Sequence, residues 1–354
     1  MILSNNLKLL LILILIISLV WFIDYNNKRN RKKLYKYVQK FKQKENRMFP
    51  FRYFTDIKGN VLPYVAVTGF FREKKAEERY YEYKKRGIHL FGITAYKYFP
   101  NRNMLENSEG SYERTDGFEY TKEIKNWLCC FRDCKKFGFT KYNYTVDMSE
   151  SDFYNMEENT DVEKKYDFIY ICNKDSDSCP LTGWNAVNRN FDLALKCFPV
   201  MFNEFNLKGL VVGRENCGLE EKYKDNITVI GWQAWGELQQ KMKEAKFLFV
   251  PNIYDASPRV VAECITKDLA VLMNENIVCG YKYINYDTGE FFTDEENIKP
   301  ALTKLLERLG KISPKKWWEK NYSQEKSYRK LRNFLHTAFQ DDNLNNINKV
   351  KFIL

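Results

Sequence analysis

The sequence predicts an α/β protein with two doubly wound, Rossmann-like domains behind a single transmembrane helix at the amino terminus. Apolar runs and charged helical stretches alternate in two separate regions, which is typical of parallel sheets with crossover helices. The first residues instead form an apolar segment long enough to enter a bilayer. We therefore divide the chain into a membrane anchor (1–24), a basic juxtamembrane segment (25–60), a first domain (61–150), a second domain (166–312) and a helical tail (313–354).

The amino-terminal segment is expected to be a retained anchor. Residues 9–23 are fifteen uncharged residues rich in Leu and Ile. A cleaved signal peptide is the alternative, but the Trp-Phe-Ile-Asp sequence at 21–24 is not a small-residue cleavage site. More basic residues follow the segment than precede it, which favours a cytoplasmic body. A lumenal body is the alternative, and only there would the sequons at Asn143, Asn226 and Asn321 matter.

The positive charge of the chain is concentrated beside this segment. The net charge is +11, from 57 Lys and Arg against 46 Asp and Glu, and residues 28–52 hold eleven basic residues and one acidic residue. The rest of the chain is nearly neutral, so we expect a membrane as a partner and no nucleic acid. The nine cysteines show neither metal-site spacing nor a small disulfide scaffold. We therefore expect mostly buried free thiols in a reducing compartment.

The first domain shows a strand, a tight turn at Gly69, a helix and a second strand. The elements that we expect are a strand at 64–68, a helix at 72–86, a strand at 88–95, a long loop at 99–120, a helix at 123–136, a strand at 142–146 and an acidic linker at 150–165.

The second domain has a more regular alternation, and we expect its ligand at the carboxyl ends of the strands. The expected strands are 166–172, 207–212, 227–230, 247–251 and 269–273, and the expected helices are 190–205, 235–244, 259–265 and 295–309, with another at 323–339 in the tail.

Several common catalytic classes lack their markers. The sequence contains no GxxxxGK[ST] phosphate loop, no GxGxxG after the first strand, no HExxH and no GxSxG. The only histidines are His89, which we expect to be packed in a strand, and His336, which we expect at the surface. Four tryptophans offer surfaces for sugars or lipids, but large aromatic side chains more often fill cores, and we expect that of Trp232, Trp235, Trp317 and Trp318.

Three stretches of the second domain resemble a known family. They are NITVIGW at 226–232, AKFLFVPNIYDASPRVVAECITKDLAVLM at 245–273 and NYDTGEFF at 285–292. They resemble the donor-binding half of family four retaining glycosyltransferases (glycosyl transferase group 1), which have the GT-B fold. The resemblance covers residues 166–310. It implies transfer of a sugar from a UDP- or GDP-sugar to a glycan, protein or lipid acceptor, with retention of configuration and no obligatory metal or other cofactor.

The resemblance also implies roles for individual residues. Two acids eight positions apart bracket the start of a helix, and Asp255 and Glu263 have that spacing. The resemblance assigns the transferred sugar to Asp255, where the family usually has Glu, and the nucleotide ribose to Glu263. It assigns the diphosphate to a basic pair, for which Lys174 and Arg189 are the candidates. Asp268 stands where the family usually has Gly, and Ala270 where it often has Pro, so the chain is a divergent example.

Further residues follow from the geometry of strand ends. A helix that begins near Ser257 and Arg259 offers free backbone N–H groups and a positive dipole end to a diphosphate. Gly213 ends a strand on the same expected edge, and we add it to the donor-binding residues. In the first domain, the pattern matches the family only generally, with Gly69 on the acceptor side.

Two other functions remain open. A membrane-tethered binding or scaffold protein could keep the fold without catalysis, with Asp255 and Asp268 as signs of decay. Alternatively, Asp175 and Asp177 resemble the metal-binding DxD of glycosyltransferases with the GT-A fold, because two carboxylates at a strand end can hold Mn²⁺ or Mg²⁺.

Overall fold

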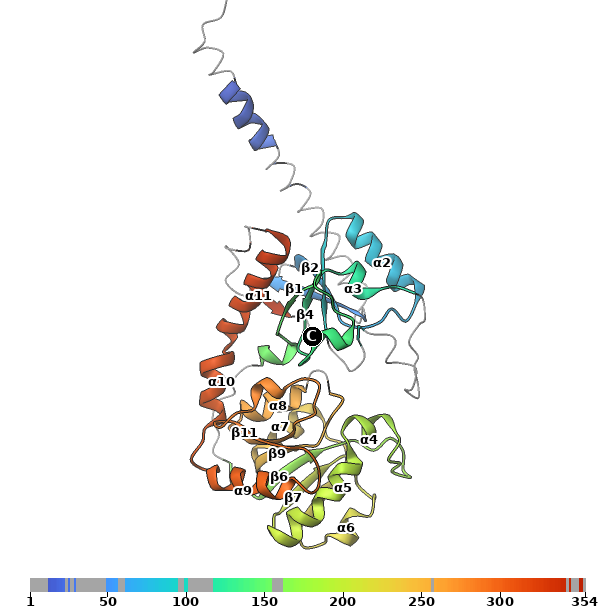
Figure 1. Cartoon of the computed structure of the whole chain (residues 1–354), viewed down its shortest axis with the longest axis vertical. Coiled ribbons are helices and arrows are strands. Elements are labelled where there is room, and N and C mark those ends of the chain that lie inside the picture. The colour runs from blue at the N-terminus through green and yellow to red at the C-terminus, as the bar shows by residue number, and fades with distance from the viewer. Residues whose placement is uncertain are drawn as a thin grey trace, which may run out of the picture.

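The computed structural model shows two α/β domains, one above the other in Figure 1. It describes residues 12–22, 25, 29, 49–56, 61–94, 99–100, 117–154, 162–255, 258–341, 344 and 350–352. Within these residues each domain has a six-stranded sheet, in the order β12-β1-β2-β3-β4-β5 and β11-β10-β9-β6-β7-β8. The α/β class and the two parallel-sheet domains expected from the sequence are confirmed.

The first sheet is parallel from β2 to β5 and antiparallel where β1 meets β2 and β12. Its β1 lies inside the stretch 25–60, for which the sequence predicts a basic juxtamembrane segment instead. The elements are β1 (Phe51–Asp56), β2 (Val61–Val67), α2 (Lys74–Lys85), β3 (His89–Ile93), α3 (Tyr120–Glu123), β4 (Asn126–Leu128), the 3₁₀ turn Cys134–Phe137, β5 (Tyr144–Val146) and the 3₁₀ turn Glu150–Phe153.

The helix expected at 123–136 is wrong. That stretch ends α3, forms β4 and then closes a short loop with a Cys129–Cys134 disulfide. The cause is the consecutive apolar run from Trp127 to Phe131, which is buried throughout, and whose first two residues belong to β4 and can be buried on both faces of the sheet. Gly92 on β3 makes room for Trp127, because a Cβ atom there would lie 2.1 Å from the indole ring.

The second sheet is wholly parallel in the pairs that the structure describes. Its elements are β6 (Tyr166–Ile171), α4 (Trp184–Asn188), α5 (Phe191–Pro199), the π-helical turn Val200–Glu204, β7 (Gly209–Val212), α6 (Leu219–Lys222), β8 (Ile227–Ile230), α7 (Trp235–Lys243), β9 (Ala245–Val250), α8 (Arg259–Ile265), β10 (Ala270–Asn274), the 3₁₀ turn Tyr281–Tyr283, β11 (Gly289–Phe292) and α9 (Ile298–Arg308).

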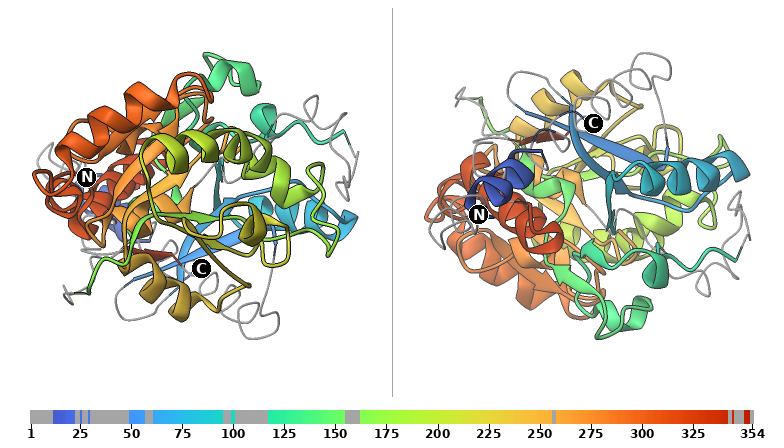
Figure 2. Two further views of the ribbon diagram at one scale, coloured as in Figure 1. Left: turned by 90° about the horizontal axis from the view of Figure 1, so that it is seen from below. Right: turned by 90° about the horizontal axis from the view of Figure 1, so that it is seen from above.

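Helices cover both faces of this sheet (Figure 2). Successive residues of β6 point to opposite faces, so Phe168 packs with α5 and α9 while Ile169 packs with α8. The sheet is therefore doubly wound, and its loops at the carboxyl ends of the strands are free to carry a site.

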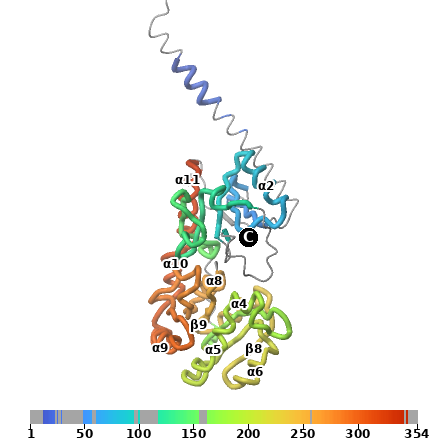
Figure 3. The backbone as a smooth tube through the Cα atoms, turned by 45° about the vertical axis from the view of Figure 1, so that its right-hand side comes forward, coloured from blue at the N-terminus to red at the C-terminus, as the bar shows by residue number. Residues whose placement is uncertain are grey.

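The tail joins the two domains (Figure 3). α10 (Pro314–Tyr322) packs on the second domain, where Trp318 is fully buried against Tyr283. α11 (Gln324–Phe339) packs on the first sheet through Leu331 and Phe334, and β12 (Val350–Phe352) pairs with β1. The carboxyl-terminal residues thus complete the core of the first domain.

The carboxyl edges of the two sheets face each other. Arg132, which follows β4, donates from its backbone N–H to the carbonyl of Val278 and from its side chain to the carbonyl of Glu275, 2.9 Å away. Lys282 forms ion pairs of 3.0 Å with Asp147 and with Asp152. Burial disfavours its charge, but the two carboxylates more than offset this effect and raise the pKa of Lys282.

The cysteines agree only in part with the expectation of mostly buried free thiols. Five are buried free thiols, namely Cys130, Cys172, Cys197, Cys264 and Cys279, but Cys129 pairs with Cys134 and Cys179 with Cys217. Spacing in the sequence could not reveal the second pair, because Cys179 and Cys217 are 38 residues apart and meet only through the fold.

The predicted anchor falls only partly within the described residues. Residues 12–22 form an exposed helix, whereas 1–11 and 23–24 lie outside the description. Within the part of the chain that the structure describes, no helix is long and apolar enough to cross a membrane.

Candidate functional site

The predicted donor residues lie in three loops at the carboxyl edge of the second sheet. Lys174 follows β6, Gly213 follows β7, and Asp255 lies between β9 and α8. Arg189 ends α4, which the chain enters from the β6 loop. Glu263 lies inside α8 and completes the group.

Lys174 bridges the first two loops. Its backbone N–H donates to the Gly213 carbonyl at 2.6 Å, and its ammonium lies 3.2 Å from Glu215 and 2.9 Å from Asp177. The hydrogen bonds to Asp177 and Glu215 raise the pKa of Lys174, so the side chain stays cationic.

Gly213 is required by the backbone. Its φ is +93°, and a Cβ atom would lie 2.5 Å from the Asn173 side chain and 2.9 Å from the Cys172 carbonyl. Any larger residue would separate the two loops at this point.

Arg189 and Asp255 form an ion pair through Nη1 and Oδ2. The buried Asn252 also donates to the same Asp255 oxygen, at 3.2 Å. The backbone carbonyl of Arg189 accepts from Tyr170, which fixes the end of α4 on the sheet. The residue predicted for the diphosphate and the residue predicted for the sugar are therefore direct neighbours.

Glu263 is buried, with 6% of its surface exposed. Its Oε1 accepts from the Tyr154 hydroxyl at 2.5 Å and from the Trp235 indole N–H at 3.4 Å. Burial, followed by the hydrogen bond to Glu263, raises the pKa of Tyr154, which therefore remains a donor at neutral pH. The Arg259 side chain is exposed at the start of α8, and its charge acts in the opposite direction on the Tyr154 pKa. Ser257 lies outside the described residues.

The tryptophan prediction is half wrong. Trp318 is buried, but Trp232 and Trp235 are 69% and 62% exposed in the loop between β8 and α7 and at the start of α7. Both residues follow a strand end on the same edge as Glu263. That position could have indicated exposure, because aromatic rings at such an edge can contact a ligand.

Arg214, which sequence analysis did not select, is completely buried. Its guanidinium lies over the Phe191 ring at 4.3 Å and donates to the Cys172 sulfur at 3.1 and 3.3 Å. Its Nη2 is 3.8 Å from Asp175. Charged residues are rarely buried in this way. The burial of Arg214, which follows Gly213 at the end of β7, could therefore be seen only in the structure.

The two acids of the metal alternative have separate partners. Asp175 accepts from the backbone N–H groups of Asn185 at 2.7 Å and Ala186 at 3.0 Å, so it caps the first turn of α4. The Asp177 side chain is 98% exposed and pairs with Lys174. Among the described residues, no group of three or more His, Cys, Asp and Glu side chains could hold a metal ion.

Gly69 on the acceptor side follows Thr68, the first residue after β2, and is buried. The aromatic residues after it pack inward, with Phe70 against Phe99 and Phe71 against Phe118, and the Phe71 N–H donates to the Tyr120 hydroxyl at 2.6 Å. His89 stacks on Tyr64 at 5.2 Å, which agrees with a packing role.

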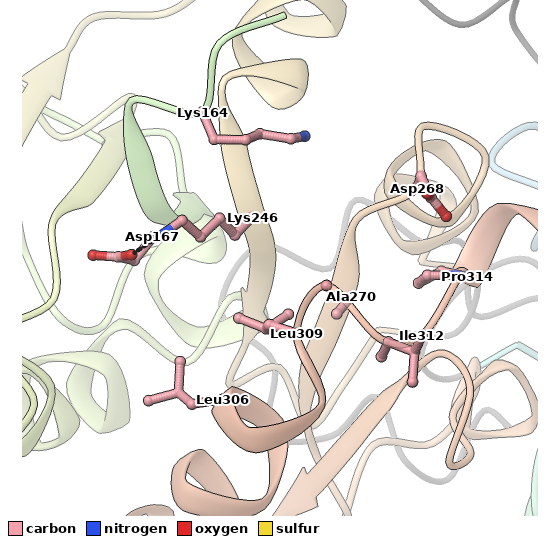
Figure 4. A pocket seen from close by; sticks show the side chains of 10 residues that line it. Lys164, Asp167, Lys246, Asp268, Ala270, Leu306, Leu309, Ile312 and Pro314 are labelled. Carbon is pink, nitrogen blue, oxygen red and sulfur yellow. Dashed lines mark hydrogen bonds and ion pairs between the residues drawn. The ribbon is translucent and has the colours of Figure 1, made fainter. Parts of the chain in front are cut away.

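A cavity of about 470 Å³ lies at the opposite edge of the second sheet (Figure 4). Lys164, Asp167, Lys246 and Ala270 line it near the amino ends of β6, β9 and β10, with Leu306 and Leu309 of the α9 region. None of the predicted donor residues lines this cavity.

The structure is similar to solved glycosyltransferases. The pneumococcal O-GlcNAc transferase GtfA in complex with UDP and GlcNAc matches with a TM-score of 0.53 and 12% identity, over 76% of this chain and 56% of that chain. A TarM mutant of S. aureus in complex with fondaparinux, alpha-GlcNAc-glycerol and UDP matches with a TM-score of 0.51 and 12% identity, over 69% and 50%. A glycosyltransferase from Rickettsia africae matches with a TM-score of 0.54 and 14% identity, over 89% and 82%.

These similarities show the GT-B fold. The chain spans about half the length of GtfA and TarM, the first two of these structures. No protein-family model matches the sequence, and no curated protein matches it. The fold class is therefore that of GT-B glycosyltransferases, and the chemistry must be argued from the chain's own residues.

Proposed function

We propose that the protein is a glycosyltransferase that moves a sugar from a nucleotide-sugar donor to a glycan, protein or lipid acceptor. The observation that carries this proposal is the Arg189–Asp255 ion pair, on the strand-end edge that also holds Lys174 and Glu263. It joins a cation suited to a diphosphate with an acid suited to sugar hydroxyls. A nucleotide-sugar needs these two groups side by side, because its diphosphate is bonded directly to its sugar.

The ion pair couples donor binding to the sugar contact. A diphosphate that binds Arg189 competes with Asp255 for the guanidinium. When Arg189 turns to phosphate, the Asp255 carboxylate gains free lone pairs for sugar hydroxyls, with Asn252 still donating to it. Lys174 supplies a second cation that stabilises the charge developing on the leaving diphosphate.

Glu263 binds the ribose hydroxyls in this proposal. The Tyr154 hydroxyl and the Trp235 N–H orient its carboxylate. Tyr154 belongs to the segment that connects the domains, so the ribose contact is tied to that connection. Retention of configuration and independence of metal are part of the proposal and rest on the resemblance of residues 166–310 to family four enzymes.

Membrane anchoring by residues 1–24 is also part of the proposal. Its support is the uncharged run at 9–23 followed by the basic segment. The two disulfides favour an oxidising compartment and hence the lumenal alternative for the body over the cytoplasmic one. Protease treatment of sealed membranes decides the side: the lumenal orientation predicts a protected body, and digestion of the body supports the cytoplasmic one.

The scaffold alternative loses one of its two supports. Asp268 has a φ of +65°, and its Oδ1 accepts from the Ser313 hydroxyl and the Lys315 N–H, both at 2.9 Å. It therefore caps the start of α10, which gives the departure from glycine a structural cause unrelated to decay of a site.

Calorimetry of the full-length chain in detergent with UDP and with GDP, in EDTA, tests the function. We expect one nucleotide to bind and Glu263→Ala to weaken it by about 1.5–3 kcal/mol, the value of a hydrogen bond to a charged group. Glu325→Ala on the distant α11 is the matched control and should bind like the native protein.

The same preparation is then supplied with UDP- and GDP-sugars, and release of the nucleotide is measured. Binding with turnover supports the transferase. Binding without turnover of any donor supports the scaffold. Binding only after Mn²⁺ is added would contradict the metal-free donor site.

A further inference from the structure

The loops after β6 and β7 are crosslinked to each other. The segment 175–188, which we call the insertion, lies between the two predicted diphosphate residues Lys174 and Arg189 and ends with α4. The Cys179–Cys217 disulfide joins the middle of this insertion to the β7 loop. Without a covalent tie, a polar insertion of this length would hold its flanking residues only weakly.

Two ion pairs reinforce the same connection. Lys174 pairs with Glu215 at 3.2 Å, and Asp175 with Arg214 at 3.8 Å, so adjacent residues of one loop meet adjacent residues of the other. We call these two ion pairs and the Cys179–Cys217 disulfide the loop crosslink.

Arg214 is the rigid part of the loop crosslink. It is completely buried, stacks on Phe191 and donates a hydrogen bond to the Cys172 sulfur. Its Nη1 has no hydrogen-bond partner among the described residues. A buried unsatisfied donor is unfavourable for stability, so packing alone does not account for Arg214 at this position. Its Nη2 forms an ion pair with Asp175 and so helps to position that carboxylate.

Asp175 transmits this position to Arg189. It caps the first turn of α4, and Arg189 is the residue at which α4 ends. The helix Trp184–Asn188 is short, so a shift of its capped end moves Arg189 by a similar amount. A displacement of about 1 Å at a binding group is enough to lower function strongly.

We propose that the Cys179–Cys217 disulfide positions Lys174 and Arg189 for the diphosphate of the donor, so that affinity for a nucleoside diphosphate depends on the redox state of this one bond. The proposal rests on the proposed function, which it deepens by naming what regulates the same site. Cys179 and Cys217 are each partly exposed and therefore accessible to a reductant, whereas the five free cysteines are buried.

The redox step is simple reduction of the bond. A phosphine such as TCEP attacks one sulfur, the S–S bond breaks, and water supplies the oxygen of the phosphine oxide and the protons of two thiols. After reduction, the two ion pairs and the hydrogen bond from the Lys174 N–H to the Gly213 carbonyl still join the loops. The Lys174–Glu215 ion pair is partly exposed and therefore weak in water.

The test compares UDP and UMP binding by calorimetry to the full-length chain in EDTA. The double variant Cys179→Ser with Cys217→Ser should bind UDP about tenfold more weakly, the loss expected for one charge-assisted hydrogen bond, and UMP nearly as well as native protein. A general loss of structure would weaken both nucleotides alike. Cys129→Ser with Cys134→Ser removes the other disulfide and should leave both affinities unchanged.

Reduction provides a second measurement should the double variant fail to fold. TCEP added to the Cys129→Ser, Cys134→Ser protein can reduce only Cys179–Cys217 among the described pairs, and it should reproduce the selective loss of UDP affinity, reversed by reoxidation. Equal UDP affinity before and after reduction overturns this inference and leaves the proposed function intact. If UDP, UMP and GDP all fail to bind in every preparation, both this inference and the proposed function are overturned.

Discussion

The two domains use the carboxyl edges of their sheets in different ways. At the edge of the second sheet, charged side chains form ion pairs between loops, as in Arg189–Asp255 and Lys174–Glu215. At the edge of the first sheet, aromatic rings fill the same place, with Phe70, Phe71 and Phe118 packed into the core. The two edges face each other. The edge of the second sheet is suited to binding an anion, whereas the edge of the first sheet is held together by packing.

The comparison indicates which half tolerates change. Ion pairs between loops can exchange partners when a ligand arrives, because their groups remain hydrogen-bonded to one partner or another. Interlocked aromatic rings cannot, because interiors are close-packed and a small volume change is felt by many neighbours. We therefore expect substitutions at the first edge to act on stability and those at the second edge to act on binding.

The largest expected effect is on the first domain. Gly92→Ala places a methyl group against the Trp127 ring, 2.1 Å from its nearest atom, and should lower the free energy of unfolding by about 3 kcal/mol. Thermal unfolding followed by circular dichroism measures it. Gly236→Ala, at an exposed position of α7 where no atom lies within 4 Å, is the control and should not destabilise. Equal stability of the two variants would contradict the packing of this edge.

The next effect belongs to the second edge and acts on function. Asp255→Asn removes the charge that pairs with Arg189, so UDP should bind slightly more tightly while turnover falls about 100-fold. Calorimetry and nucleotide release measure the two quantities on one preparation. Parallel loss of both would show that Asp255 holds the loop rather than the sugar.

The sequence predicted the fold well where periodicity is strong. α2, α7 and α8 lie within two residues of their expected limits, as do the central strands of the second sheet. It failed at residues 123–136, where a short buried strand has the same composition as a buried helix. It also did not reveal that α11 completes the first domain, because an amphipathic helix does not specify which sheet its apolar face will cover.

The site was predictable only to the level of strand ends. Lys174, Arg189, Asp255 and Glu263 could be selected because each follows or lies near a predicted strand end. The Arg189–Asp255 ion pair joins positions 66 residues apart, and Tyr154 reaches Glu263 from the segment between the domains. Such partners are set by the packing of whole elements, for which local sequence carries no signal.

A smaller effect on stability is expected at Asp268, which lies between α8 and β10. Asp268→Ala removes the cap of α10 and leaves a left-handed residue with a Cβ atom, at a cost of about 2 kcal/mol. Asp268→Gly removes the same cap but relieves the backbone, so it should cost less than about 1 kcal/mol. Chemical denaturation of the two variants measures the difference. Equal costs would mean that the left-handed backbone plays no part.

Tyr154→Phe should lower the free energy of unfolding by only about 1 kcal/mol, because Glu263 still accepts a hydrogen bond from the Trp235 N–H. The loss should depend on pH. The raised pKa of Tyr154 means that the folded state keeps a proton that the unfolded state releases above pH 10, so this stability is present below pH 10 and declines above it. Unfolding measured from pH 8 to 11 should show a shallower alkaline decline in the variant than in native protein, with Tyr142→Phe, at an exposed position, as control.

The smallest effect is expected at Asp177, and it separates the two readings of the charged edge. The carboxylate is 98% exposed and touches the site only through its ion pair with Lys174, so Asp177→Ala should change UDP affinity in EDTA by less than about threefold. The direction should be a gain, since Lys174 loses a competitor for phosphate and keeps Glu215. A metal site built on Asp175 and Asp177 requires the opposite: UDP binding that needs Mn²⁺ and disappears in the variant. Calorimetry with and without Mn²⁺ distinguishes a cationic edge that binds the diphosphate directly from an acidic one that binds it through an ion.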